Sequence, residues 1–188
     1  MSAVVVPVAA NQAVTNPAVT NPAGTGPRAS LERVFDPEIP VLTIGDLGVL
    51  RTVTVDQAGH VEVVITPTYS GCPAMDAIRD DIVTALATDG FTDVTVRTEL
   101  APAWSTDDIT DRGRQRLREF GIAPPHAVRH EGPVPLTLGF SRRRTPSVVC
   151  PRCASSHTRE ISRFSSTACK AHYVCQACHE PFDYFKEL

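Results

Sequence analysis

The chain lacks the segments that would place it in a membrane or outside the cell. Its apolar runs fall short of the roughly 20 residues that a helix needs to cross a bilayer. The apolar start at residues 3–10 has no basic n-region and is interrupted by Pro7, so it makes a poor signal peptide. We therefore expect a cytoplasmic protein with no membrane partner.

The chain also has little excess charge and none of the residue sets of a self-sufficient oxidoreductase. Its formal net charge of -3 at pH 7 gives no basic surplus, so nucleic acid is not an expected partner. We find no di-iron carboxylate helices, no glycine-rich dinucleotide loop and no Ser-His-Asp set. An independent oxidoreductase is therefore not expected.

Composition divides the chain into four parts. The start repeats Val-Thr-Asn-Pro-Ala at 14–18 and 19–23 and has too little apolar surface to offset the entropy of ordering. Periodic apolar segments follow, then a proline-rich stretch, then a segment that holds five of the six cysteines. These features predict a disordered tail (1–28), an α/β domain (29–122), a linker (123–147) and a metal-binding domain (148–188).

The first domain alternates strand-like and helix-like periods. Ser30 is a candidate N-cap for a short helix, and the later segments change between a period of two and a period of three to four. We expect a helix at 31–35, a hairpin of strands at 49–55 and 60–65, a helix at 73–90, a strand at 94–100 and a helix at 105–120. This order predicts an α/β (α+β) fold, a small sheet with helices over one face.

A single cysteine lies between the second expected strand and the helix that follows it. Pro73 is suited to the first helical position, which puts Cys72 at or near the N-cap, facing unpaired N–H groups and the positive end of the helix dipole. Both effects favour the thiolate. The glycine before Cys72 permits a tight turn, and the hydroxyl of Thr68 lies on its approach. We therefore predict a nucleophile or a soft-metal ligand at Cys72.

Two other interpretations of Cys72 remain open at this stage. A lone cysteine in an intracellular domain is often just a small buried hydrophobe. A thiol enzyme could pair Cys72 with an acidic partner such as Asp46, but the nearest histidine in sequence, His60, lies at the far end of the preceding strand. The sole tryptophan, Trp104, is interpreted as a lid on the core rather than a stacking surface.

The last domain carries a strong metal-binding pattern. Two Cys-x-x-Cys pairs, Cys150 with Cys153 and Cys175 with Cys178, are separated by 21 residues and supply four thiolates. In a reducing compartment this spacing predicts a zinc ribbon whose metal provides much of the folding free energy. The same four sulfurs can hold iron, so the spacing leaves the metal open. Cys169 is surplus to a four-ligand site.

Motifs in both domains resemble known families. These motifs are Asp36-Pro37-Glu38-Ile39-Pro40, Asp46-Leu47-Gly48, Thr66 to Pro73, Pro102-Ala103-Trp104, Cys150-Pro151-Arg152-Cys153, Ser166 to Ala171 and Glu180 to Lys186. By the first four, the first domain resembles the iron–sulfur assembly family that includes SufT-type and MIP-type proteins. With the ribbon motifs, the chain resembles the PaaD family of accessory subunits in phenylacetyl-CoA epoxygenase (ring-1,2-epoxidase) systems. The resemblance covers about residues 30–188, and departs at Ser165, where a glycine is expected.

The resemblance implies an accessory role in phenylacetate degradation. In such systems a di-iron oxygenase is served by a reductase with a flavin and a 2Fe–2S cluster, and the PaaD-type subunit assists cluster maturation without being the catalyst. By position, Cys72 would be the transfer cysteine, holding a transient cluster. Asp36, Glu38 and Asp46 would be acidic residues near it, and Thr68 lies in the same loop.

The implied partner is the epoxygenase complex, chiefly its iron–sulfur reductase subunit. A carrier must hold a cluster and release it, which one thiolate can do with a second ligand from a partner or from a second copy in a homodimer. The alternative is a scaffolding subunit of the oxygenase complex that uses the structural zinc ribbon and the basic helix for binding.

Overall fold

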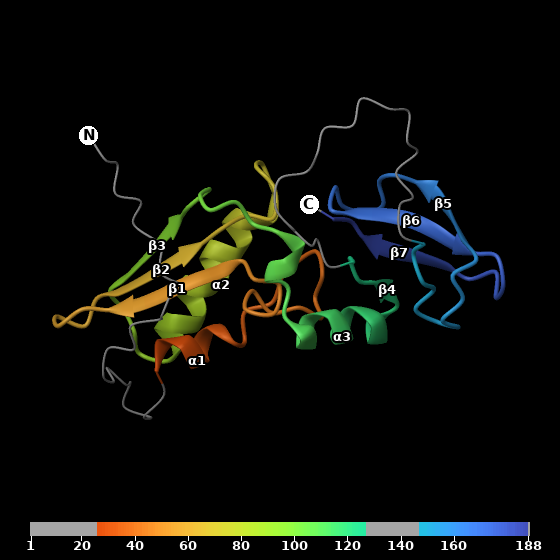
Figure 1. The fold of residues 1–188 in the computed structure, drawn as a ribbon. Helices are drawn as coiled ribbons and strands as arrows, with labels where there is room; N and C mark the ends of the chain where they lie inside the picture. Colours follow the sequence, from red (N-terminus) through yellow and green to blue (C-terminus); the bar gives the residue numbers. More distant parts are fainter. Residues whose placement is uncertain (1–25, 127–146, 188) are drawn as a thin grey trace, which may run out of the picture.

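The computed structural model describes residues 26–126 and 147–187 (Figure 1). The predicted tail at 1–28 and the predicted linker at 123–147 lie largely outside the described residues. The described chain folds as a mixed α/β structure with two small sheets. In these parts of the chain no helix is long and apolar enough to cross a membrane.

The first sheet has three strands in the order β1-β2-β3. Strands β1 (Leu50–Val55) and β2 (Val61–Ile65) form the predicted antiparallel hairpin, and β3 (Val94–Thr98) pairs with β2 in parallel. A parallel pair needs a crossover connection, which α2 (Ala74–Thr88) supplies. The predicted helix at 73–90 is therefore what separates the two parallel strands.

Helix α2 covers the sheet with an apolar stripe of helical period. Its residues Met75, Ile78, Ile82 and Leu86 are buried in one core with the alternating valines of β2. The helix ends at Asp89, and Gly90 follows with a φ of +88°, a left-handed conformation that glycine adopts without strain.

The first helix differs from the prediction. Helix α1 (Pro27–Leu31) begins at a proline, and Ser30 lies in its last turn rather than at an N-cap. The Ser30 hydroxyl instead donates to the carboxylate of Asp89, which also pairs with Arg33. The Ser30 hydroxyl therefore binds a residue distant in sequence rather than a backbone N–H of its own helix, as local capping would require.

The helix predicted at 105–120 is divided in two. The 3-10 helix η1 (Thr106–Asp108) starts with a capping box in which the Ser105 N–H donates to the Asp108 carboxylate at 2.9 Å. Ile109 is extended, and α3 (Asp111–Phe120) then starts afresh with Thr110 as its N-cap. Ser105 therefore caps the 3-10 helix, and Thr110 caps α3 as a second, separate N-cap.

The second sheet has four strands in the order β4-β7-β6-β5. Strands β5 (Thr158–Ser162), β6 (Lys170–Cys175) and β7 (Pro181–Phe185) are antiparallel neighbours and form the ribbon. The short strand β4 (Ile122–Ala123) pairs with β7 in parallel directly after α3. The end of the first domain is thus hydrogen-bonded into the ribbon sheet (Figure 1).

An aromatic pair lies where the ribbon packs on the first domain. Trp104 is 5% exposed, its indole N–H donates to the Leu47 carbonyl at 3.0 Å, and its ring centroid lies 6.1 Å from that of Phe185. Phe185 itself is buried in the core of the first domain. The structure confirms Trp104 as a core lid and shows that the ribbon closes over it.

Candidate functional site: a cysteine corner beside a separate four-cysteine centre

The backbone at the corner after β2 presents Cys72 just ahead of helix α2. Gly71 has a φ of +96°, and the Cys72 N–H donates to the Tyr69 carbonyl at 3.2 Å to close a tight turn. Pro73 is the N-cap, so Cys72 lies one residue before the cap. The Cys72 carbonyl still accepts from the Met75 N–H at 3.4 Å, which joins the turn to the helix.

The ionisation of Cys72 runs opposite to the sequence-based expectation. The side chain is half-buried, and this burial raises the pKa of the Cys72 thiol above its ordinary value. A backbone N–H of Ala74 lowers the pKa, but the nearby carboxylates of Glu38 and Asp36 raise it. The predicted stabilisation of the thiolate by the helix start was therefore wrong in its net effect, because burial and negative neighbours outweigh the N–H groups.

The two acidic residues come from a tight turn that precedes the first strand. Asp36 is 6% exposed, and one oxygen of its carboxylate accepts the N–H groups of Glu38 and Ile39, each at 2.8 Å. Burial raises the pKa of Asp36, and burial together with Asp36 raises that of Glu38. The charges of Asp36 and Glu38 thus act on the Cys72 thiol, and their role in shaping the site stays a prediction.

The ribbon contributes two further groups that the sequence did not assign to this place. Cys169 is buried in the core of the first domain, and Cys72 packs against the same core. The neighbouring Lys170 is 5% exposed, and its charge acts on the carboxyls of both Asp36 and Glu38. The only sequence signal for this pair was that Cys169 is left over once four metal ligands are assigned.

Asp46 belongs to a different cluster. Its carboxylate is fully buried and accepts hydrogen bonds from Arg112 Nε at 2.7 Å, Arg116 Nη1 at 2.8 Å and the Thr110 hydroxyl at 3.1 Å. Burial alone would raise the pKa of Asp46, but these donors and charges lower it. Because both oxygens are taken by α3, Asp46 is not the acidic partner that a Cys72 thiol enzyme would need.

Two further predicted features of the first domain are the basic face of α3 and Thr68. The basic face of α3 is largely used within the chain, since Arg112 and Arg116 bind Asp46 and Arg114 donates to the carbonyls of Thr106 and Pro125. It therefore offers less free charge for a partner than the sequence suggested. Thr68 is half-buried in the Cys72 loop, and its role stays a prediction.

The candidate metal centre is formed by the four predicted ribbon cysteines. The sulfurs of Cys150, Cys153, Cys175 and Cys178 all lie within 4.8 Å of one another. The Cys150–Cys178 and Cys153–Cys175 separations are 3.8 and 3.5 Å. A tetrahedral zinc with bonds of about 2.3 Å places its sulfurs about 3.8 Å apart, so the donor set fits zinc.

The local backbone and electrostatics of this centre suit a cation. Ala154 and His179, each one residue after a knuckle, adopt left-handed φ values of +60° and +62° that turn the chain back around the sulfurs. An N–H of Ser155 lowers the pKa of Cys153, but the three neighbouring sulfurs raise it, and the net value is about 12. The four sulfurs can close a tetrahedral shell around a cation, which leaves no open coordination position.

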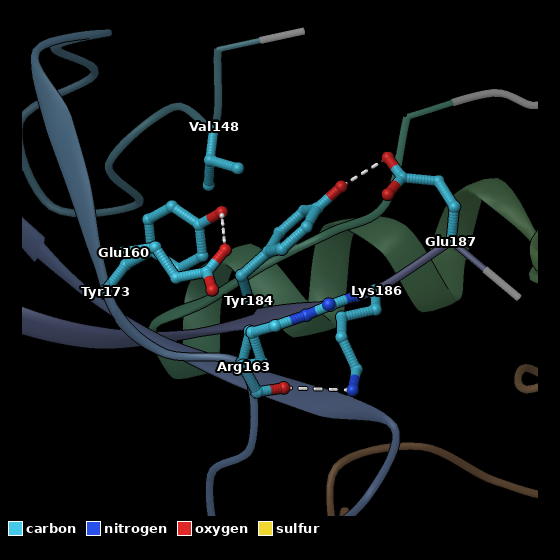
Figure 2. Close-up of a pocket in the computed structure, with 8 residues that line it drawn as sticks. Val148, Glu160, Arg163, Tyr173, Tyr184, Lys186 and Glu187 are labelled. Atoms are coloured by element: carbon cyan, nitrogen blue, oxygen red, sulfur yellow. Dashed lines mark hydrogen bonds between the residues drawn. The ribbon is translucent and has the colours of Figure 1, made fainter. Parts of the chain in front are cut away.

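A hollow of about 270 Å³ on the ribbon carries no comparable chemistry (Figure 2). Its tyrosines, glutamates and lysine have hydrogen-bond partners: the Tyr173 hydroxyl donates to Glu160 at 3.1 Å, the Tyr184 hydroxyl donates to Glu187, and Lys186 donates to a backbone carbonyl at 3.0 Å. Burial and Glu160 raise the pKa of Tyr173 to about 12. We assign no site to this hollow.

Two family models match the chain, one for each domain. The iron-sulfur cluster assembly protein model covers residues 28–98, which include Cys72, and the PaaD zinc beta ribbon domain model covers residues 138–186. A crystal structure of a domain of unknown function from Bacillus anthracis is similar to 48% of this chain and 87% of its own, at 29% identity and a TM-score of 0.46.

Two curated relatives extend the comparison. The chain is 52% identical over 158 residues to the Escherichia coli (strain K12) protein named as the D subunit of "Putative 1,2-phenylacetyl-CoA epoxidase", covering 84% of this chain and 89% of the relative. It is 34% identical over 88 residues to the "Fe-S protein maturation auxiliary factor" of Porphyromonas gingivalis (strain ATCC BAA-308 / W83), covering 46% of this chain and 83% of the relative. The chain therefore belongs to the PaaD family of phenylacetyl-CoA epoxidase subunits, with an iron–sulfur cluster assembly domain followed by a zinc ribbon.

Proposed function

We propose that the chain is an accessory factor of phenylacetate degradation that assists iron–sulfur cluster maturation or transfer, with the cluster held as cargo at Cys72. Support comes from the two relatives, one named as an epoxidase subunit and the other as an Fe-S protein maturation auxiliary factor. The segment that matches the iron-sulfur cluster assembly protein model, residues 28–98, includes Cys72. The recipient that we propose is the iron–sulfur reductase subunit of the epoxidase complex.

The observation that carries this proposal is a half-buried thiol that lies directly ahead of helix α2 and feels the charges of two carboxylates. Cys72 has a raised pKa because of burial and of Glu38 and Asp36, so the free thiol is a weak nucleophile at neutral pH. A bound iron ion favours the thiolate, and binding releases the proton. Loss of the cargo lets the thiol take a proton again, and this cost of ionisation weakens binding in the way that a carrier needs.

The ribbon differs from Cys72 in the permanence of its metal site. Four thiolates in a closed tetrahedral shell leave no position for exchange, so the zinc there is architectural. It stabilises a domain whose β7 pairs with β4 and whose Phe185 reaches the core of the first domain. We therefore assign transfer to the corner and structural support to the ribbon.

The test is maturation of the reductase in cells that carry either the wild-type chain or Cys72→Ser. We expect the reductase purified from the Cys72→Ser strain to contain less iron and sulfide per chain, while Ser70→Ala, an exposed change in the same loop, leaves both unchanged. Equal iron and sulfide content in all three strains would contradict the proposal. Co-purification of the Cys72→Ser chain with the oxygenase subunits in that case would favour a scaffolding subunit.

A further inference from the structure

Cys169 and the four metal cysteines lie in the same ribbon but in different cores. Cys150 and Cys175 are buried in the ribbon's own apolar core. Cys169, 5% exposed, belongs instead to the core of the first domain, the same core against which Cys72 packs. The fold therefore separates one ribbon cysteine from the metal centre and places it with the cysteine of the corner.

The position of Cys169 is set by the ribbon's own hydrogen bonds. Its carbonyl accepts from the Lys186 N–H at 2.9 Å, which ties it to the segment directly after β7. Its sulfur lies 3.0 Å from the Thr167 hydroxyl, and the Lys170 N–H donates to the Thr167 carbonyl at 3.2 Å. Figure 1 shows this start of β6 at the end of the ribbon that faces the loop following β2.

The two thiols share charged neighbours as well as a packed core. The carboxylates of Glu38 and Asp36 act on both thiols, and in each case they raise the pKa after the larger effect of burial. Two thiolates would add to the negative charge already present, and the only buried cation that acts on this group in the described chain is Lys170. A cationic cargo would relieve that repulsion.

We propose that Cys169 is the second sulfur ligand of the cargo at Cys72, so that one chain supplies two thiolates, one from each domain, to a single iron–sulfur cluster. This inference rests on the proposed function and names the ligand that would otherwise come from a second copy. On binding, each thiol loses its proton to solvent and forms one S–Fe bond in place of one donor thiolate, which leaves, while donor thiolates remain on the other two outer positions of the cluster. On transfer, thiolates of the recipient replace both S–Fe bonds, the two protons return, and no electron moves.

The test uses the full-length chain and a preformed 2Fe–2S cluster coordinated by glutathione, with native mass spectrometry and iron and sulfide analysis under anaerobic conditions. We expect one cluster per wild-type monomer. Cys169→Ser and Cys72→Ser should each reduce retention at least about tenfold, since even outer-shell changes at metal sites cost 10–100-fold. Ala168→Ser, an exposed change in the same loop, should retain the cluster. One zinc per chain verifies that each variant keeps its ribbon.

The outcomes separate the two proposals. Full retention by Cys169→Ser with loss in Cys72→Ser would overturn the role of Cys169 and leave the proposed function standing. Clusters found only in wild-type dimers would also overturn it, because they would show that a second chain supplies the other ligand, and this outcome can be read even if Cys169→Ser fails to fold. No cluster on the wild type, or full retention by Cys72→Ser, would contradict the proposed function itself.

Discussion

Cys169 of the ribbon lies in the same packed core against which Cys72 of the first domain rests. The two residues are far apart in sequence and share this core because the ribbon docks on the first domain through β4 and Phe185. Docking therefore does more than stabilise the chain, since it completes the surroundings of the corner cysteine.

The first prediction concerns the reactivity of Cys72. Because burial and the carboxylates of Glu38 and Asp36 raise its pKa, alkylation by iodoacetamide should be slow at pH 7 and should accelerate only as pH rises above the ordinary thiol range. The rate is measured by mass spectrometry of the Cys72 peptide. Glu38→Gln should shift this profile to lower pH, and an apparent pKa below about 8 in the wild type would contradict the assignment.

The second prediction concerns Asp46 as a structural anchor. Asp46→Asn removes the charge that accepts hydrogen bonds from Arg112 and Arg116, so the free energy of unfolding should fall by about 2 kcal/mol. Retention of cargo at Cys72 should not change. Denaturant unfolding and cluster loading measure the two quantities, with the exposed change Asp80→Asn as control. Loss of cluster binding at unchanged stability would return Asp46 to the transfer site.

The third prediction is the pH dependence of that anchor. Its neighbours lower the pKa of Asp46 in the folded chain below the ordinary value of 3.8. The stabilisation is therefore fully present above pH 3.8 and is lost as pH falls through the lower, folded-state pKa. Unfolding followed between about pH 5 and pH 2 should show a steeper loss of stability for the wild type than for Asp46→Asn; parallel curves would count against this account.

The fourth prediction uses the sole tryptophan to report ribbon docking. Removing the ribbon metal with a strong chelator should unfold the ribbon, because a structural zinc supplies about 10–16 kcal/mol of apparent binding free energy in small zinc domains. Phe185 would then leave Trp104, and the tryptophan emission should shift to the red. Cys175→Ser should reproduce the shift without chelator, whereas Cys72→Ser should not. Unchanged emission on metal loss would show that docking is independent of the metal.

Much of the fold could be predicted because its signals are local. The hairpin of β1 and β2, the helix that follows Pro73 and the four ribbon cysteines are each encoded within a short stretch of sequence. Family motifs also named Asp36 and Glu38 as acidic neighbours of Cys72, and the charges of both carboxylates act on its thiol.

What could not be predicted depends on contacts between distant segments. Ser30 is a residue type that often caps helices, but its hydroxyl binds Asp89 instead. Asp46 lies in a glycine-flanked turn, but its carboxylate accepts hydrogen bonds from arginines of α3. The prediction of a thiolate at Cys72 was wrong for the same reason. The sequence shows the N–H groups at the helix start, which lower the pKa of Cys72, but it does not show the burial by the rest of the chain, which raises it. The position of Cys169 in the core of the first domain depends on how the two domains dock, and the periodicity of the sequence does not predict that docking.

The most direct test of the central claim is cluster transfer in solution. Full-length chain loaded anaerobically with a 2Fe–2S cluster is mixed with the cluster-free reductase, and the reductase's iron content and electron-transfer activity are followed in time. The account predicts that the loaded wild type restores both, and that Cys72→Ser treated in the same way does not. Restoration at the same rate by Cys72→Ser, or by iron and sulfide without the chain, would contradict it.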